Sequence, residues 1–218
     1  MKRFFLAIVF CFGIVVGFAQ EEKGAIDFKN EGNEALRSKD YAGALKLYET
    51  ALSKWGDEPK DTAMVYNMAV CAYQSKDFAK AIKLLDETIA MDYKKETALL
   101  YKINTYRLTK NDEEYEKTLE IALANSPNDD KLKGMLANVY LKEANVFYTS
   151  GANILKDAAA DVAAAKYKTT DDQYKVATEK AKDEFKKALP LVEKALVIDP
   201  ENATGKQLKA ACEQNIKG

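Results

Sequence analysis

The stretch that decides the fold is GNEALRSKDYAGALKLYETAL, residues 32–52. It predicts two short helices joined by a tight turn at Lys39-Asp40. Small residues such as Gly32 and Ala44 allow the two helices to approach closely, and the ring of Tyr48 fills the space between neighbouring pairs. The stretch therefore predicts one helix-turn-helix unit.

The same unit returns along the chain. It is repeated around residues 67–82 and again around residues 106–128. Equivalent residues lie 34 positions apart in three pairs, which are Ala81 and Tyr115, Thr88 and Ala122, and Tyr106 and Tyr140. The first spacing, from Ala44 to Ala81, is 37 because three extra residues fall in the polar linker 56–61, where an insertion shifts no helix face. A period of this length indicates stacked helix pairs.

At these offsets the sequence resembles the tetratricopeptide repeat family, over roughly residues 25–200. The resemblance implies an all-α fold, a right-handed superhelix of stacked antiparallel helix pairs. We place the repeats at residues 25–58, 62–95, 96–129 and 130–200, and a polar-backed capping helix at residues 203–216, within a domain of residues 20–218. Tyr115 and Thr88 stand where the pattern has alanine, so we expect the second and third pairs to pack less tightly than the first.

The fourth repeat is much longer than the others. Ala122 and Ala195 are 73 residues apart where 34 are expected, which indicates an insertion of 39 residues at about 143–182. The insertion is rich in alanine and keeps a helical apolar spacing, so it predicts a hairpin that lengthens both helices of the pair.

Within this hairpin we expect a first helix over residues 130–166, with a kink or break at Ser150-Gly151 as the alternative. Residues 169–172, Thr-Thr-Asp-Asp, supply the turn and the N-cap of the second helix. Pro190 should bend that second helix, because it removes one backbone donor.

The first residues differ from the repeats. Met1-Lys2-Arg3 is followed by an apolar run that ends at Phe18. The run is shorter than the roughly 20 residues that span a bilayer, so it indicates an export signal at residues 1–19, cleaved after Ala19. The alternatives are an uncleaved membrane anchor and a lipoprotein signal at Cys11. The second conflicts with the large residue directly before that cysteine.

Charge and cysteines exclude other classes of protein. Without the signal, 31 basic residues face 34 acidic ones, a formal charge of −3, and no basic cluster is present. This argues against a nucleic-acid partner. Cys71 and Cys212 fall in different helical units, so we expect no disulfide between them and interpret Cys71 as a core thiol.

The sequence offers little for catalysis. It contains no histidine, which removes the commonest general base and the usual zinc ligand. The acidic groups at residues 112–114, 129–130 and 171–172 are interpreted as helix starts, where carboxylates cap free amides. The glycines are scattered, and the oxygen-rich segment 125–130 lacks the glutamate of a calcium loop. We predict no catalytic residue, no cofactor and no metal.

In such a scaffold the first helices of the pairs line a concave groove. The predicted groove residues are Lys29, Asn33, Asn67, Asn104 and Asn138. The first three match positions that grip a terminal carboxylate in tetratricopeptide domains that bind the carboxyl end of chaperones. That clamp also needs a lysine and an arginine, where this chain has Thr97 and Tyr101. The three residues are therefore interpreted as contacts to an acidic or extended peptide, or as structural side chains.

The hairpin is the second predicted working surface. It either caps the array by burying the last repeat, or it binds a partner or a second copy of the chain. Its aromatic residues are the expected contacts, and they are Phe147, Tyr148, Tyr167 and Tyr174.

The inserted hairpin and the segments that flank it resemble exported tetratricopeptide proteins of Gram-negative bacteria. The resemblance implies a periplasmic or secreted protein with no permanent membrane span and with a non-enzymatic scaffold role. We expect it to bind another protein or peptide of the cell envelope through the groove, the hairpin or both. Two alternatives are an assembly factor that handles outer-membrane proteins in transit, and a hydrolase of envelope polymers that works through two carboxylates.

Overall fold

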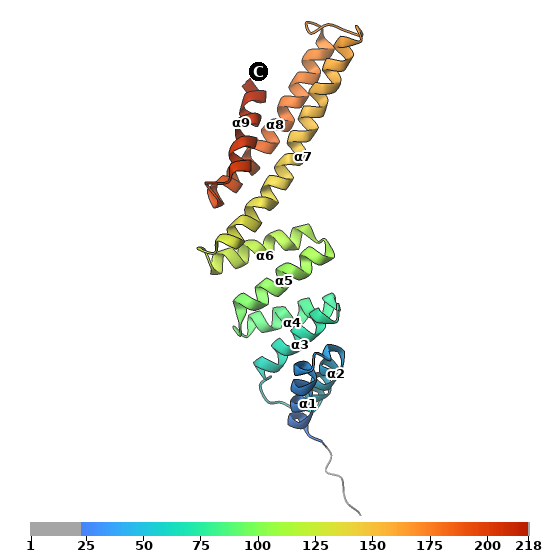
Figure 1. Cartoon of the computed structure of the whole chain (residues 1–218), viewed down its shortest axis with the longest axis vertical. Helices are drawn as coiled ribbons and strands as arrows, with labels where there is room; N and C mark the ends of the chain where they lie inside the picture. Colours follow the sequence, from blue (N-terminus) through green and yellow to red (C-terminus); the bar gives the residue numbers. More distant parts are fainter. Residues whose placement is uncertain (1–22, 218) are drawn as a thin grey trace, which may run out of the picture. The chain divides into compact units, whose positions relative to one another are not determined.

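The computed structural model describes residues 23–217, so the predicted export signal lies outside the described residues. The described part of the chain is helical with no strand, which confirms the predicted all-α class (Figure 1). In chain order the helices are α1 (Ala25–Arg37), α2 (Tyr41–Ser53), α3 (Thr62–Gln74), α4 (Phe78–Ala90), α5 (Lys95–Thr109), α6 (Asp112–Asn125), α7 (Asp130–Ala163), α8 (Asp172–Ile198) and α9 (Ala203–Lys217). None of these helices is both long enough and apolar enough to cross a membrane. The chain divides into two compact units, Met1–Lys60 and Asp61–Gly218.

The first unit contains the pair α1 and α2. α2 begins after Asp40, whose side chain accepts a hydrogen bond from the Gly43 amide at 2.9 Å. Gly32 of α1 lies against the buried ring of Tyr48, and a Cβ at this position would be 2.7 Å from that ring. The glycine therefore allows the close approach of the two helices that the sequence predicts.

The second unit contains α3 to α9, and each helix packs on the next one along the chain (Figure 1). Asp61, Asp77 and Asp129 precede α3, α4 and α7, and their side chains accept hydrogen bonds from first-turn amides. Thr88 is fully buried, and its hydroxyl donates to the Leu84 carbonyl at 2.7 Å. The polar atom at this alanine position is therefore satisfied.

α7 and α8 form a long antiparallel hairpin (Figure 1). α7 runs through Gly151 and ends at Ala163, so the break considered at the glycine does not occur. Gly151 instead allows close packing, because a Cβ there would lie 2.8 Å from the Phe185 ring and 3.0 Å from the Ala181 carbonyl oxygen. α8 likewise continues through Pro190.

A side-chain hydrogen bond stabilises the turn between α7 and α8, and helix packing holds α9 at the end of the second unit. Asp171 precedes α8, as predicted, but its side chain accepts a hydrogen bond from the Lys168 amide at 2.8 Å and so stabilises the turn. α9 packs on α8 and buries Cys212. Cys71 of α3 is also buried, and within the described residues no disulfide joins it to Cys212.

Candidate functional site

A groove is lined by residues of α6 and of the N-terminal half of α7. The N-terminal half of α7 packs into the core through Leu132 and Leu136, which are 4% and 3% exposed. A neighbouring stripe of the same helix carries Met135, Val139 and Val146, and these side chains form the apolar floor of a groove of about 560 Å³. The polar residues of its rim are Asp112, Glu113, Glu116, Asn138, Lys142 and Glu143.

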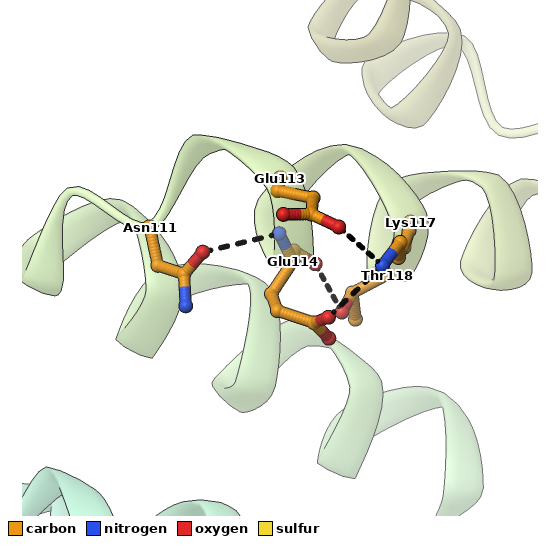
Figure 2. Close-up of polar contacts among 5 residues, drawn as sticks. All are labelled: Asn111, Glu113, Glu114, Lys117 and Thr118. Carbon is orange, nitrogen blue, oxygen red and sulfur yellow. Dashed lines mark hydrogen bonds and ion pairs between the residues drawn. The ribbon is translucent and has the colours of Figure 1, made fainter.

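The α6 side of the rim is fixed by the start of that helix, which Figure 2 shows. Asn111 precedes the helix, and its side-chain oxygen accepts a hydrogen bond from the Glu114 amide at 3.3 Å. The Lys117 ammonium lies 2.7 Å from Glu113 Oε1 and 3.3 Å from Glu114 Oε1. The Thr118 hydroxyl donates to the Glu114 carbonyl oxygen at 2.6 Å. The acidic residues 112–114 thus lie in a first helical turn, as interpreted from the sequence.

The rim carries more negative than positive charge. An ion pair joins Lys142 Nζ of α7 to Asp112 Oδ2 of α6 at 3.3 Å, with side chains 75% and 78% exposed. Such an exposed pair contributes little to stability. Within residues 23–217, Glu116 of α6 and Glu143 of α7 form no ion pair. The groove therefore presents two carboxylates that no lysine or arginine of the described chain neutralises by direct contact.

Glu116 lies beside a partly buried hydrogen bond. The Tyr140 hydroxyl donates to Glu120 Oε1 at 2.7 Å, and Lys194 Nζ of α8 lies 5.3 Å from the centre of the Tyr140 ring. Burial, followed by the charges of Glu120 and Glu143, raises the pKa of Glu116. Lys194 and a hydrogen bond from Tyr140 act in the opposite direction. Carboxylates are therefore crowded on this side of the groove.

Tyr115, at a repeat position that is alanine in the first two units, lies at the groove. Ala44, Ala81 and Tyr115 occupy equivalent positions, and the two alanines are fully buried. The ring of Tyr115 packs against the core and also lines the groove. The sequence pattern shows this departure at Tyr115 but does not predict Glu143 or Val146 as site residues. Their signal was a stripe of apolar and acidic residues on one face of a long predicted helix.

Comparisons with known proteins agree with this architecture. A model of the tetratricopeptide repeat family matches residues 35–101. A repeat protein of known structure from Bacteroides fragilis, described by the same repeat, is 25% identical over 88% of this chain and 99% of that chain, with a TM-score of 0.57. Residues 35–101 of this chain therefore match tetratricopeptide repeats, and the chain has the fold of a tetratricopeptide repeat protein. The STIP1 homolog of Dictyostelium discoideum is 28% identical over 152 residues, which are 66% of this chain, and the chain spans about a quarter, 24%, of the length of that curated relative.

Two of the predicted tetratricopeptide groove residues lie in the first unit. Lys29 Nζ is 5.9 Å from the centre of the Trp55 ring. Asn33 Oδ1 accepts a hydrogen bond from the Tyr48 hydroxyl at 2.8 Å, so it joins α1 to α2. Asn33 thus makes a side-chain contact within its own helix pair, and the binding role of both residues stays a prediction.

The other three lie in the second unit and are not gathered in one place. Asn138 lines the α6–α7 groove, Asn104 is hydrogen-bonded within α5, and Asn67 is half-buried on α3. Tyr101, which stands where the clamp needs arginine, packs edge to face on Tyr73 with 5.0 Å between ring centres. Of these residues, only Asn138 belongs to the groove described above.

The aromatic residues of the hairpin are engaged mainly within the hairpin itself. Tyr148 of α7 packs on Phe185 of α8 with 5.4 Å between ring centres, and Phe147 packs against the core. The Tyr167 hydroxyl donates to a carbonyl oxygen of α7 at 3.4 Å, and Tyr174 is half-buried. These contacts stabilise the hairpin, and a partner-binding role for the four residues stays a prediction.

The chemistry available in the groove is that of carboxylates. Among the residues that the structure describes, no three Asp, Glu or Cys side chains are placed to hold a metal ion. Glu116 and Glu143 line the same groove and interact electrostatically. The site is solvated, since Val146 on its floor is 64% exposed. The groove therefore places two interacting carboxylates beside solvent-exposed apolar surface.

Proposed function

We propose that this tetratricopeptide repeat protein is a non-enzymatic interaction module that binds a segment of another protein in the groove between α6 and α7. The observation that carries the proposal is the apolar floor of Met135, Val139 and Val146, with Val146 64% exposed to solvent. Burial of such surface drives association, and an apolar centre with a polar rim is the usual anatomy of a protein interface. Proteins built from stacked helix pairs use such surfaces for their partners.

We place the partner in the cell envelope. The support is the charged start and apolar run of residues 1–19, which has the composition of an export signal. A factor that handles outer-membrane proteins in transit is a special case of the same proposal, because it also receives a protein segment.

Site-specific photo-crosslinking in cells that produce the full chain tests the groove. A photoreactive amino acid replaces Val146 in one variant and Val176 in the other. Val176 is a matched control, because it is 53% exposed and lies on α8, outside the groove. We expect Val146 to yield one discrete adduct that disappears when Met135→Asp is added to the same chain, with the helical content unchanged by circular dichroism.

Two results would contradict the proposal. Adducts of equal yield from Val146 and Val176 would indicate that the partner contacts the hairpin as a whole and not the α6–α7 groove. Adducts at Val146 that survive Met135→Asp would show that the apolar floor is not the contact surface.

The hydrolase of envelope polymers is a second candidate, because Glu116 and Glu143 share the groove. Purified cell-wall polymer is incubated with the protein and with the double variant Glu116→Gln, Glu143→Gln, and soluble fragments are measured. We expect no release by either protein. Release by the unmodified chain alone would replace the binding proposal with catalysis.

A further inference from the structure

Two carboxylates on the rim of the α6–α7 groove lack an ion-pair partner in the described chain, residues 23–217. Asp112 and Glu113 each pair with a lysine, whereas Glu116 and Glu143 do not. Lys194 of α8 acts on Glu116 electrostatically without forming an ion pair with it. The groove therefore keeps a negative charge that a ligand can neutralise.

The position of each carboxylate in its helix also separates Asp112 and Glu113 from Glu116 and Glu143. Asp112 and Glu113 stand in the first turn of α6, where free amides and the helix dipole favour negative charge. Glu116 lies beyond that turn, and Glu143 is in the interior of α7, where a helix terminus offers no such compensation. The groove lining holds four carboxylates and one lysine, whereas the whole chain has a formal charge of only −1.

Acidic and apolar side chains are interleaved along the groove. On α7, Val139, Glu143 and Val146 follow one another at three- and four-residue spacing and line the same side. Glu116 lines the α6 side of the same groove. The stripe from Met135 to Val146 is about 16 Å long, which is the length of about five extended residues. The site thus suits a short segment that carries charge and apolar surface side by side.

From this placement we infer that the groove selects a partner segment in which lysine or arginine side chains stand beside large apolar ones. The apolar side chains pack on Val139 and Val146, and the cations lie against Glu116 and Glu143 through charge-assisted hydrogen bonds. This inference rests on the proposed function and specifies the chemistry of the partner for the same groove. Burial is the main cause of the raised pKa of Glu116, and a bound cation relieves the second cause, the repulsion from Glu120 and Glu143.

Lys142, on the rim of the groove, offsets part of the negative charge that would attract a cationic ligand. Its pair with Asp112 is exposed and therefore weak, so Lys142 can leave Asp112 at small cost, but its own charge repels a cationic ligand. Neutralising Lys142 should then strengthen binding, while neutralising Glu116 or Glu143 should weaken it. A groove that recognises apolar side chains alone predicts no change in either case.

The test is fluorescence anisotropy of the full chain with three labelled peptides of about seven residues, long enough to span the stripe when extended. Leucine alternates with lysine in the first peptide, with glutamine in the second and with glutamate in the third. We expect the lysine peptide to bind at least about five-fold more tightly than the glutamine peptide, and the glutamate peptide to bind most weakly. The preference should shrink when salt is raised from about 0.05 to about 0.5 M, because screening weakens exposed charge pairs.

Single variants then assign the preference to the groove. Glu116→Gln and Glu143→Gln should each weaken binding of the lysine peptide about two- to five-fold, and Lys142→Gln should strengthen it about two-fold. Glu58→Gln makes the same change of charge at an exposed position in the linker between the two units and should leave affinity unchanged.

The outcomes separate this inference from the proposed function. If the three peptides bind alike and Val146→Asp abolishes binding of all three, the charge selection is wrong and the groove still binds. Tightest binding of the glutamate peptide, no binding of the lysine peptide, or equal weakening by Glu58→Gln would each overturn the inference. Crosslinking at Val146 decides the proposed function independently of the peptides.

Discussion

α7 has two faces that meet their neighbours in different ways. On the closed face, defined by Tyr148 and Gly151, the helix packs directly on α8, and Phe185 opposite is 1% exposed. On the open face, defined by Met135, Val139 and Val146, the side chains line a groove; Met135 and Val139 also pack partly against the core, and Val146 is exposed. This difference in packing predicts different effects of substitution on the two faces. Substitutions on the closed face should reduce stability, and substitutions on the open face should reduce binding at nearly constant stability.

Among the substitutions on the closed face, Phe185→Ala should reduce stability most. Removal of this buried ring leaves a cavity between α7 and α8, so we expect a loss of about 3–5 kcal/mol in the free energy of unfolding. Denaturation in urea, followed by circular dichroism, measures it. Phe185→Leu keeps most of the volume and should cost less than about 1.5 kcal/mol. A loss below about 1 kcal/mol for the alanine variant would mean that the hairpin is not held by this contact.

Two glycines of α7 differ in the space that surrounds them, so the same substitution should have opposite effects on stability at the two positions. Gly151→Ala places a Cβ 3.0 Å from the Ala181 carbonyl oxygen and 2.8 Å from the Phe185 ring, and the backbone oxygen cannot move away easily. We expect a loss of about 1–3 kcal/mol, because overpacking exceeds the gain in helix propensity.

Gly134→Ala is the matched change, because a Cβ at Gly134 has no atom within 4 Å. Here the propensity gain is unopposed, and stability should rise by about 0.5–1 kcal/mol. Thermal unfolding of both variants checks the pair. The closed-face account fails if the two alanines shift stability in the same direction by the same amount.

The repeat pattern predicts the closed contacts much better than the open ones. The close approach at Gly32 follows from small residues at a fixed period, which is a local property of the sequence. Glycine weakens a helix, so the sequence allows a break at Gly151, but tertiary packing on Phe185 determines its role. The position of Asn33 in the repeat predicts a groove contact, whereas its side chain accepts a hydrogen bond from Tyr48 in the partner helix of its own pair. Val146 lies in a groove only because the extended α7 leaves α6, and a linear period contains no information about that geometry.

The smallest expected effect concerns the charge on the open face. The pKa of Glu116 is raised, first by burial and then by Glu120 and Glu143, so the folded protein binds this proton more tightly than the unfolded chain does. The ionised carboxylate therefore lowers stability at neutral pH, and this penalty disappears as the pH falls through the raised pKa of Glu116. Glu116→Gln should be slightly more stable than the unmodified chain at neutral pH, by no more than about 0.5 kcal/mol, and the advantage should vanish below about pH 4.

Binding should respond to pH in the opposite sense from stability. Protonation of Glu116 removes the negative charge that attracts a lysine side chain, so affinity for the lysine peptide should fall over the same pH interval in which the stability penalty disappears. The Glu116→Gln variant should lose this part of the pH dependence, whereas Glu58→Gln should keep it. A Glu116→Gln variant that is less stable at neutral pH would show that the attraction of Lys194 and the Tyr140 hydrogen bond outweigh the repulsion from the other carboxylates. The negative charge of Glu116 would then stabilise the folded protein and would not be available to a ligand.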